Sequence, residues 1–408
     1  MNDAPSDLTP MERSSPWEIL WVFLRLGLTS FGGPVAHLGY FRTDFVERRR
    51  WMDERSYADL VALCQFLPGP ASSQVGIAVG LARGGWWGSL AAWAGFTLPS
   101  ALALIGFALA LSQHADWVDA GALQGLKVAA VAVVAQAVWG MSKALCPDRP
   151  RAALAIGAAL LTLLLPTAFA QVGAIVACGL VGWRLLHLPG QQAVEHRSYG
   201  VSRWAGVTAL ASFALLLVGL PLLAAATASP VLVTLDAFYR AGALVFGGGH
   251  VVLPLLQSAV VPGGAVSNAE FLAGYGAAQA VPGPLFTFAA YLGAVMRPEV
   301  AGIGGWLGGL ACLLAIFLPA WLLVVGTLPF WDFLRQRPTV QSALAGVNAG
   351  VVGILLAALY DPVWTSAIGS RADFGLALAA FALLVYARMS PLLVVVLTAG
   401  AGWLRSMV

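Results

Sequence analysis

Apolar stretches alternate with short polar segments along the whole chain of 408 residues. Continuous apolar runs occupy residues 86–111, 118–141, 152–165 and 168–186, and a second set lies near 301–328, 340–360, 373–387 and 391–405. An α-helix rises 1.5 Å per residue, so about 20 residues cross a hydrocarbon core of ~30 Å. The pattern predicts an all-α polytopic membrane protein. The runs after residue 150 are short enough for a tight pair that does not fully cross.

Shorter apolar runs are interrupted by strong helix breakers. Residues 57–67 and 71–82 flank Pro68, Gly69 and Pro70, and the same triplet returns at Pro282, Gly283 and Pro284. A half-helix of about 11 residues spans about 16 Å, roughly half of the hydrocarbon core. We expect pairs of half-helices that meet near mid-membrane, as re-entrant or discontinuous helices. The alternative is that each triplet only kinks a spanning helix.

The chain also repeats itself, because residues 23–187 match residues 238–407 in order. Each half reads as two broken helices followed by about four spanning helices. We predict a disordered tail at 1–16, a first repeat at 17–187, a cytoplasmic linker with a connecting transmembrane helix at 188–230, and a second repeat at 231–408. The second repeat is predicted to be inverted relative to the first.

Charge supports the inversion. The loop at 42–55 carries five arginines, whereas its partner loop in the second half carries no lysine or arginine, and the loops at 112–119 and 330–338 show the opposite asymmetry. Basic loops stay in the cytoplasm, so corresponding loops are expected on opposite sides of the membrane. Inverted repeats with discontinuous helices are typical of secondary transporters that bind substrate near the midplane.

Composition narrows the class further. The residues are 59% apolar and 10% charged, and the small net charge of +3 is explained by membrane orientation, so we expect a lipid bilayer and no nucleic acid as partner. The four cysteines show no metal-binding spacing, and no nucleotide-binding P-loop motif occurs. We predict no cofactor, no metal and no enzymatic activity. The polar start of the chain shows no cleavage pattern, so we expect it to be retained.

The interrupted helices give the first candidate site. A helix that stops at membrane depth must face protein or water, and the next half-helix offers free N–H groups and a positive dipole end to an anion. Ser72 and Ser73 follow the first break as hydroxyl donors, while Gln65 and Gln279 precede the two breaks at equivalent positions. The alternative is that these side chains only satisfy freed backbone carbonyls.

Other candidates recur in both halves. Arg25 and Arg240 occupy one equivalent position inside apolar runs, where an arginine is costly unless it is paired or faces a cavity. The alternatives are that they snorkel to the membrane interface or form an ion pair with a nearby acid such as Asp236 or Glu18. The candidate glycines are Gly32, Gly33, Gly247 and Gly248, which suit either an N–H nest or close helix packing.

Lys127 lies inside a predicted crossing, and its equivalent position holds Asn348. A cation there suits a bound anion, although snorkelling or a carboxylate partner would also explain it. His37 and His250 follow the glycine breaks without aligning, and we interpret them as structural residues and not as proton carriers.

The motifs at Phe23 to Pro34, QFLPGP, Phe238 to Pro254 and QAVPGP resemble those of the chromate ion transporter family, in its long two-domain form. The resemblance covers nearly the whole chain. It implies a prokaryotic inner-membrane protein that exports chromate and so gives resistance, with two antiparallel halves. Chromate is the expected substrate. A sulfate or related oxyanion carrier and an anion channel are the alternatives, and a homodimer is left open.

Overall fold

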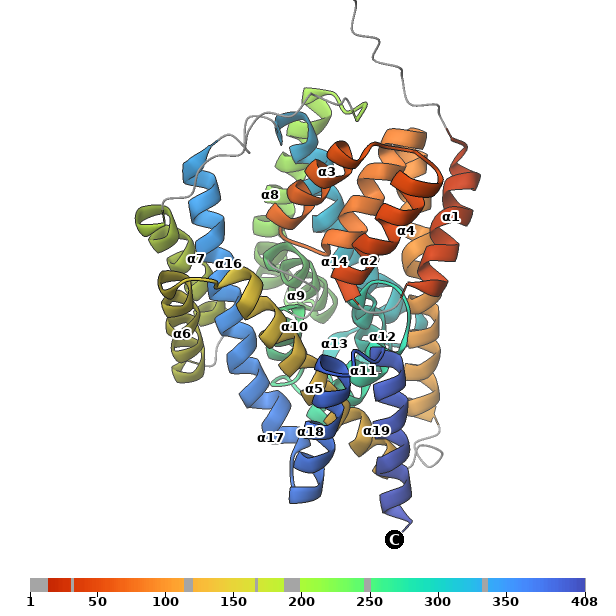
Figure 1. Ribbon diagram of the computed structural model, residues 1–408, viewed down its shortest axis with the longest axis vertical. Coiled ribbons are helices and arrows are strands. Elements are labelled where there is room, and N and C mark those ends of the chain that lie inside the picture. Colours follow the sequence, from red (N-terminus) through yellow and green to blue (C-terminus); the bar gives the residue numbers. More distant parts are fainter. Residues whose placement is uncertain are drawn as a thin grey trace, which may run out of the picture.

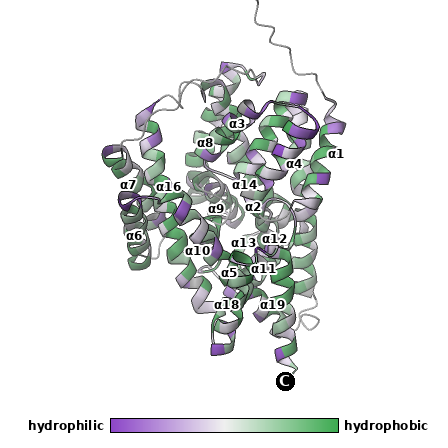
Figure 2. Cartoon of the chain, viewed as in Figure 1, coloured by the Kyte–Doolittle hydropathy of each residue, from purple (hydrophilic) through white to green (hydrophobic). Residues whose placement is uncertain are grey.

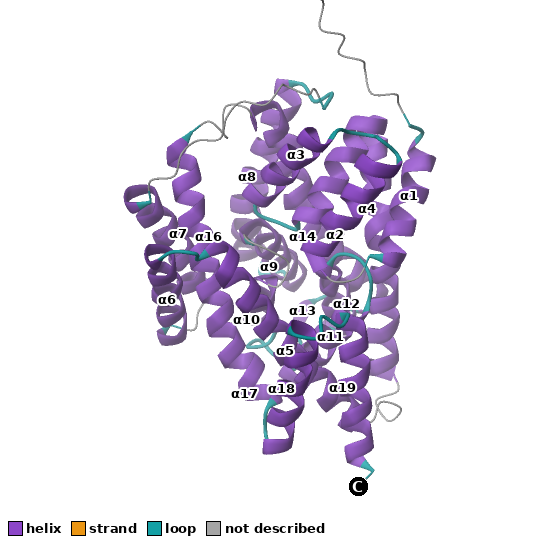
Figure 3. Ribbon diagram, viewed as in Figure 1, coloured by secondary structure: helices purple, strands orange, loops and turns teal. Residues whose placement is uncertain are grey.

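The structure is a computed structural model that describes residues 14–30, 33–113, 120–165, 168–186, 199–245, 251–331 and 337–407. Within these ranges the chain forms helices and loops and no strands (Figure 3), as the hydrophobic pattern predicts. Five stretches of helix are long and apolar enough to cross a membrane, namely Ala71–Leu111, Gly121–Leu145, Arg203–Thr227, Gly305–Phe330 and Pro338–Ala367. The protein is a polytopic membrane protein.

The first half contains α1 (Pro16–Thr29), α2 (Gly33–Arg42), η1 (Thr43–Arg48), α3 (Glu54–Phe66), α4 (Ala71–Gln113), α5 (Ala120–Leu145), α6 (Arg149–Leu164) and α7 (Ala168–Leu185). The connecting helix is α8 (Arg203–Thr227). Helices α6 and α7 are shorter than a full crossing, as their apolar runs predict.

The second half contains α9 (Pro230–Leu244), α10 (Val252–Val260), α11 (Asn268–Ala280), η4 (Leu285–Thr287), α12 (Phe288–Val295), α13 (Pro298–Ala301), α14 (Gly305–Thr327), η5 (Leu328–Phe330), α16 (Pro338–Ala358), η6 (Leu359–Trp364), α17 (Thr365–Ala367), α18 (Arg371–Val385) and α19 (Pro391–Ser406). In Figure 1, α1 and α3 lie in the upper part of the molecule, whereas α11, α18 and α19 lie in the lower part.

Helix α4 is in fact two helices that fold against each other. The backbone leaves the helical conformation at Gly84 (φ −135°) and Gly85 (φ +60°). Glycine adopts a positive φ without strain because it has no Cβ. The two arms touch where Gly80 faces Gly88, because a Cβ added to Gly80 would lie 2.4 Å from the Gly88 carbonyl oxygen. The second half repeats this contact between Gly293 of α12 and Gly308 of α14. Small residues thus let the arms of each hairpin pack backbone to backbone.

The long helices of the two halves are exchanged. Helix α5 packs along α18 and α19 of the second half, and α16 packs along α6 and α7 of the first. Glycine again permits the approach: an added Cβ would lie 2.1 Å from the Thr398 carbonyl oxygen at Gly125, and 2.1 Å from the Cys178 carbonyl oxygen at Gly346. Each half therefore completes the bundle of the other.

The outer faces of the helices are suited to lipid. Figure 2 shows hydrophobic residues along the length of most helices and hydrophilic residues mainly near their ends. On α8, the large apolar side chains of Trp204, Leu215 and Leu222 are exposed. A bilayer buries such side chains without protein contacts, which explains why α8 packs few residues inside the molecule.

Candidate functional site

The two proline-bracketed breaks meet the opposite half of the molecule. The backbone N–H of Gly69 donates to the carbonyl oxygen of Val245 at the end of α9, at 2.6 Å. The backbone N–H of Gly283 donates to the carbonyl oxygen of Ser30 at the end of α1, at 2.9 Å. Ser30 and Val245 occupy equivalent positions in the repeat. The bonds are therefore reciprocal, and they satisfy backbone groups that lipid cannot satisfy.

Both triplets interrupt their helices and do not merely kink them. Helix α3 ends at Phe66 and α4 begins at Ala71, while α11 ends at Ala280 and η4 begins at Leu285. The central glycines adopt φ +120° at Gly69 and φ +99° at Gly283, a region that residues with a side chain rarely enter. Pro68, Pro70, Pro282 and Pro284 thus bracket a true change of chain direction.

The serine pair after the first break is buried. Ser72 is 1% exposed and Ser73 is 2% exposed, within the first turn of α4. Ser72 Oγ lies 3.3 Å from His37 Nδ1 of α2, whereas Ser73 Oγ has no hydrogen-bond partner within the described part of the chain. The freed carbonyl of Pro68 is satisfied by the side-chain amide of Gln74, at 2.8 Å. The serines are therefore not needed for that carbonyl.

The two repeat-equivalent arginines, Arg25 and Arg240, are paired with acids. Arg25 contacts Asp44 at 2.5 Å, and Asp44 also accepts from Arg49 at 3.0 Å. Arg240 contacts Asp236 one helical turn earlier, at 2.5 Å. The alternative expectation of an ion pair is thus correct for both residues, with Asp44 taking the place foreseen for Glu18. Each guanidinium remains about half exposed, so it retains donors for another anion.

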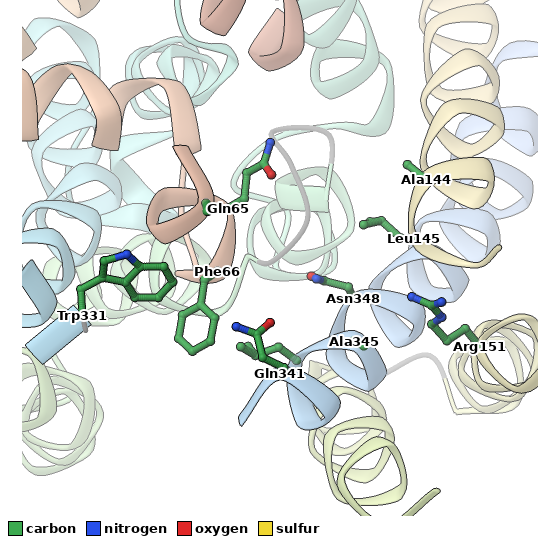
Figure 4. Close-up of a pocket in the computed structure, with 11 residues that line it drawn as sticks. Gln65, Phe66, Ala144, Leu145, Arg151, Trp331, Gln341, Ala345 and Asn348 are labelled. Carbon is green, nitrogen blue, oxygen red and sulfur yellow. The ribbon is translucent and has the colours of Figure 1, made fainter. Parts of the chain in front are cut away.

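Gln65 and Asn348, from opposite halves of the sequence, line one cavity of about 220 Å³. In Figure 4, Gln65 and Phe66 approach from α3, and Gln341 and Asn348 approach from α16. The remaining lining residues are Ala62, Ala144, Leu145, Arg151, Trp331, Leu344 and Ala345. A cavity of this size has room for a tetrahedral anion together with some of its water.

The equivalent hairpin in the other half packs more closely on its neighbouring long helix. There α11 lies directly on α5, because an added Cβ at Gly276 would come within 2.6 Å of the Leu126 carbonyl oxygen. Gln279 follows Gly276 by one turn, and its Nε2 atom is buried without a hydrogen-bond partner among the described residues. Lys127 follows Leu126 directly and is half-buried. The structure thus packs the elements of Gln279 and Lys127 against each other, and a separate cavity of about 360 Å³ on α5 is lined by Gln124, Ala372 and Arg405.

Of the candidate glycines, only Gly33 is described. It begins α2 with φ +78°, a conformation for which glycine is suited. Gly32, Gly247 and Gly248 lie outside the described residues, and so does His250.

Sequence reasoning missed three polar or aromatic residues of the cavity, Arg151, Gln341 and Trp331. Arg151 belongs to a basic loop that the sequence explains by membrane orientation alone. Its guanidinium contacts the exposed Asp148 at 2.6 Å. Hydrogen bonds from Arg151 hold the pKa of the Asp148 carboxyl below its usual value. The carboxylate is therefore charged at neutral pH and competes with any anion for Arg151.

Among the described residues, no group of three or more histidine, cysteine, aspartate or glutamate side chains is arranged to hold a metal ion. The four cysteines are free thiols.

Comparison with known proteins gives a family. The family model described as "Chromate transporter" matches residues 17–183 and again residues 232–403. The chain is 29% identical over 421 residues to the chromate transport protein of Pseudomonas aeruginosa, covering 98% of this chain and 95% of that protein. It is 27% identical to the probable chromate transport protein of Synechococcus elongatus (88% and 87% covered) and 26% identical to the chromate transport protein of Cupriavidus metallidurans (84% and 81% covered). No solved structure is significantly similar to the chain.

Proposed function

Because this chain belongs to the chromate transporter family, we propose that it is a secondary carrier that exports chromate across the cytoplasmic membrane through two inverted halves. The observation that carries the proposal is the reciprocal pair of backbone hydrogen bonds from Gly69 to Val245 and from Gly283 to Ser30. Two broken helices that exchange equivalent bonds fit a pseudo-twofold relation between the halves. Such a joint between broken helices is where secondary transporters place their substrate.

The inversion is supported by independent observations. In Figure 1, α3 of the first half lies in the upper part of the molecule and its repeat partner α11 lies in the lower part. The long helices exchange partners in matched pairs, α5 with α19 and α16 with α7. The basic loop at 42–55 supports a cytoplasmic location for the α3 hairpin in this proposal.

Chemistry at the breaks suits an oxyanion. The N-terminal turn of the half-helix that begins at Ala71 offers amide donors, and the buried hydroxyls of Ser72 and Ser73 lie in the same turn. Arg25 and Arg240 add half-exposed positive charge on α1 and α9, the helices whose ends accept the Gly283 and Gly69 bonds, and each is paired with an acid. A dianion that moves outward down an inside-negative potential of 100 mV gains about 4.6 kcal/mol, so the potential favours export.

The cavity between α3 and α16 provides access from the cytoplasm in this proposal. It is lined by the amides of Gln65, Gln341 and Asn348, which bind an anion without fixing it by full charge. Arg151 lies at the same cavity next to the exposed Asp148. In this proposal the direct contact between α11 and α5 narrows the corresponding path on the other side, where a cavity of about 360 Å³ lies between α5, α18 and α19. This geometry corresponds to an inward-facing state of an alternating-access carrier.

Sulfate is the second candidate substrate, because hydroxyl and amide donors recognise charge and tetrahedral shape and barely distinguish it from chromate.

The test is transport by everted membrane vesicles with the potential and the pH gradient clamped separately. We expect labelled chromate to accumulate in the vesicles when the potential favours outward movement, and cells that express the protein to tolerate more chromate. Sulfate transport without chromate transport would reassign the substrate. Currents far above the turnover of a carrier would contradict the carrier mechanism in favour of a channel.

A further inference from the structure

The two halves differ sharply in polarity around the joint of the broken helices. In the first half, a group of polar side chains surrounds it, namely Ser30, His37, Ser72, Ser73, Thr97 and Ser100, and all are at most 2% exposed. They come from the end of α1, from α2 and from both arms of α4. Four separate segments of chain thus place hydroxyl or imidazole groups in one buried region.

Direct contacts connect this region. His37 Nδ1 lies 3.3 Å from Ser72 Oγ, and the imidazole packs edge-on against Phe96, with 5.3 Å between ring centroids. A Cβ added to Gly283 would lie 3.2 Å from the Phe96 carbonyl oxygen and 2.9 Å from Ser100 Oγ. The Gly283 N–H itself donates to Ser30. The second-half break therefore sits directly against the first-half polar group.

Several of these polar atoms have no partner. Ser30 Oγ, His37 Nε2, Ser73 Oγ and Thr97 Oγ1 are buried, and none makes a hydrogen bond to any residue that the structure describes. Buried polar atoms are nearly always hydrogen-bonded in native proteins, and exceptions call for an explanation such as a bound ion or water. A ligand with four acceptor oxygens would satisfy hydroxyl and N–H donors of this kind.

The equivalent positions of the second half are almost entirely apolar. Val245 replaces Ser30, Val252 replaces His37, Phe286 replaces Ser72, Phe317 replaces Thr97 and Ala320 replaces Ser100. All five are buried in the structure. Thr287, which is equivalent to Ser73 in the repeat, keeps a hydroxyl, but this hydroxyl donates to the Pro284 carbonyl oxygen at 2.8 Å. The backbone bonds at the joint are related by the repeat, but the side chains are not. The first-half residues form a polar wall, and the equivalent second-half residues form an apolar wall.

We propose that each chain binds a single tetrahedral oxyanion at this joint, held by the first-half group of Ser30, His37, Ser72 and Ser73, while the second half contributes backbone and an apolar wall. The inference rests on the proposed function for the nature of the ligand and deepens it by assigning one site to one half. His37 acts here as a hydrogen-bond donor to the anion. A doubly charged ion facing one polar wall keeps contact with that wall while the halves move.

The experiment measures equilibrium binding of labelled chromate and labelled sulfate to the purified full chain in detergent. We expect one ion bound per chain. His37→Val and Ser30→Val, which copy the second-half residues, should each weaken binding at least tenfold. The matched changes in the apolar wall, Val252→Ala and Val245→Ala, should weaken binding clearly less than the first-half variants do. Unfolding temperature and elution volume in size-exclusion chromatography serve to confirm that each variant is folded.

Two bound ions per chain, or equal losses from first-half and second-half variants, would overturn the inference. So would normal binding by folded His37→Val and Ser30→Val proteins. Failure of the proposed function gives a different result, because a protein that binds one oxyanion through the first half but moves no chromate in vesicles would contradict export and leave the single site supported.

Discussion

The two proline-bracketed hairpins have the same design but different neighbours. Beside α3 lies a cavity of about 220 Å³ toward α16, whereas α11 lies directly on α5 at Gly276 and Leu126. Ala62 and Gly276 occupy equivalent positions, so the two hairpins differ in how closely they pack on the neighbouring long helix. In a carrier with equivalent halves, this difference describes the direction that the molecule faces and not a difference in construction.

The largest effect is expected from joining the half-helices of either side. Replacing Pro68, Gly69 and Pro70 by three alanines removes the breakers and the Gly69 bond to Val245. We expect chromate transport to be lost from vesicles that still contain the inserted protein. The same change at 282–284 should have an equal effect, since the two bonds are reciprocal. Retained transport in either variant would contradict a shared joint.

The acids that hold the arginines sharpen the comparison. Asp44 is 4% exposed and holds both Arg25 and Arg49, whereas Asp236 holds Arg240 alone. Removing a buried carboxylate costs up to ~3–5 kcal/mol, less where the arginine reaches water. We expect Asp44→Asn to lower the unfolding temperature in detergent more than Asp236→Asn does. The reverse order would show that the first-half cluster is not the stronger one.

A larger side chain distinguishes the hairpin that packs closely from the one that lines the cavity. Gly276→Leu forces a side chain into the Leu126 backbone and should destabilise the protein by ~1–3 kcal/mol, as overpacking does. Ala62→Leu projects beside the cavity and should be close to neutral, within ~0.5 kcal/mol, the range of surface changes. Thermal unfolding of the two variants measures the difference. Equal losses would mean that both sides are packed alike.

Water access gives a readout of the same asymmetry in the membrane. Cys64, Cys178 and Cys312 are buried, so Cys146→Ser removes the one native thiol that is partly exposed. Gln65→Cys or Gln279→Cys is then introduced into this variant. A water-soluble maleimide added from the cytoplasmic side should label position 65 at least tenfold faster, a difference of ~1.4 kcal/mol in accessibility. Similar rates would show that the closed contact at α11 opens as readily as the cavity at α3.

The smallest effect is expected at the edge of the cavity. The Asp148 carboxylate forms an ion pair with the Arg151 guanidinium, with 2.6 Å between a carboxylate oxygen and a guanidinium nitrogen. An exposed ion pair is worth less than ~1 kcal/mol, so Arg151→Gln should raise the KM for chromate about threefold and Asp148→Asn should lower it by a similar factor. Initial rates in everted vesicles measure both. Opposite shifts are the expected signature, and two shifts of the same sign would exclude competition for Arg151.

Much of this arrangement follows from local sequence. The breaks at Gly69 and Gly283 were predictable, because proline and glycine act on their own backbone wherever they occur. Helix bounds followed from apolar runs, including the short α6 and α7. The pairing of Arg25 with Asp44 was not predictable, since the two are 19 residues apart and meet only when α1 and η1 fold side by side.

The cavity shows the same limit. Gln65 and Asn348 stood out because each has a repeat partner, but Arg151 and Trp331 have no such mark. They reach the cavity through the exchange of α16 into the first-half bundle, which depends on glycine contacts between distant helices. The polar and apolar walls of the joint were readable from the alignment of the halves only after the structure showed which positions surround it.

The exchange of α5 and α16 makes the two halves interlocked. Neither half possesses a complete set of helix neighbours, since α7 rests on α16 and α19 rests on α5. A chain cut in the linker should therefore give two fragments that are each unstable alone and that assemble only when they are made together. The helix bundle of such a protein is complete only after its last helix has inserted into the membrane. Cellular quality control would therefore recognise the folded whole chain and not a folded half.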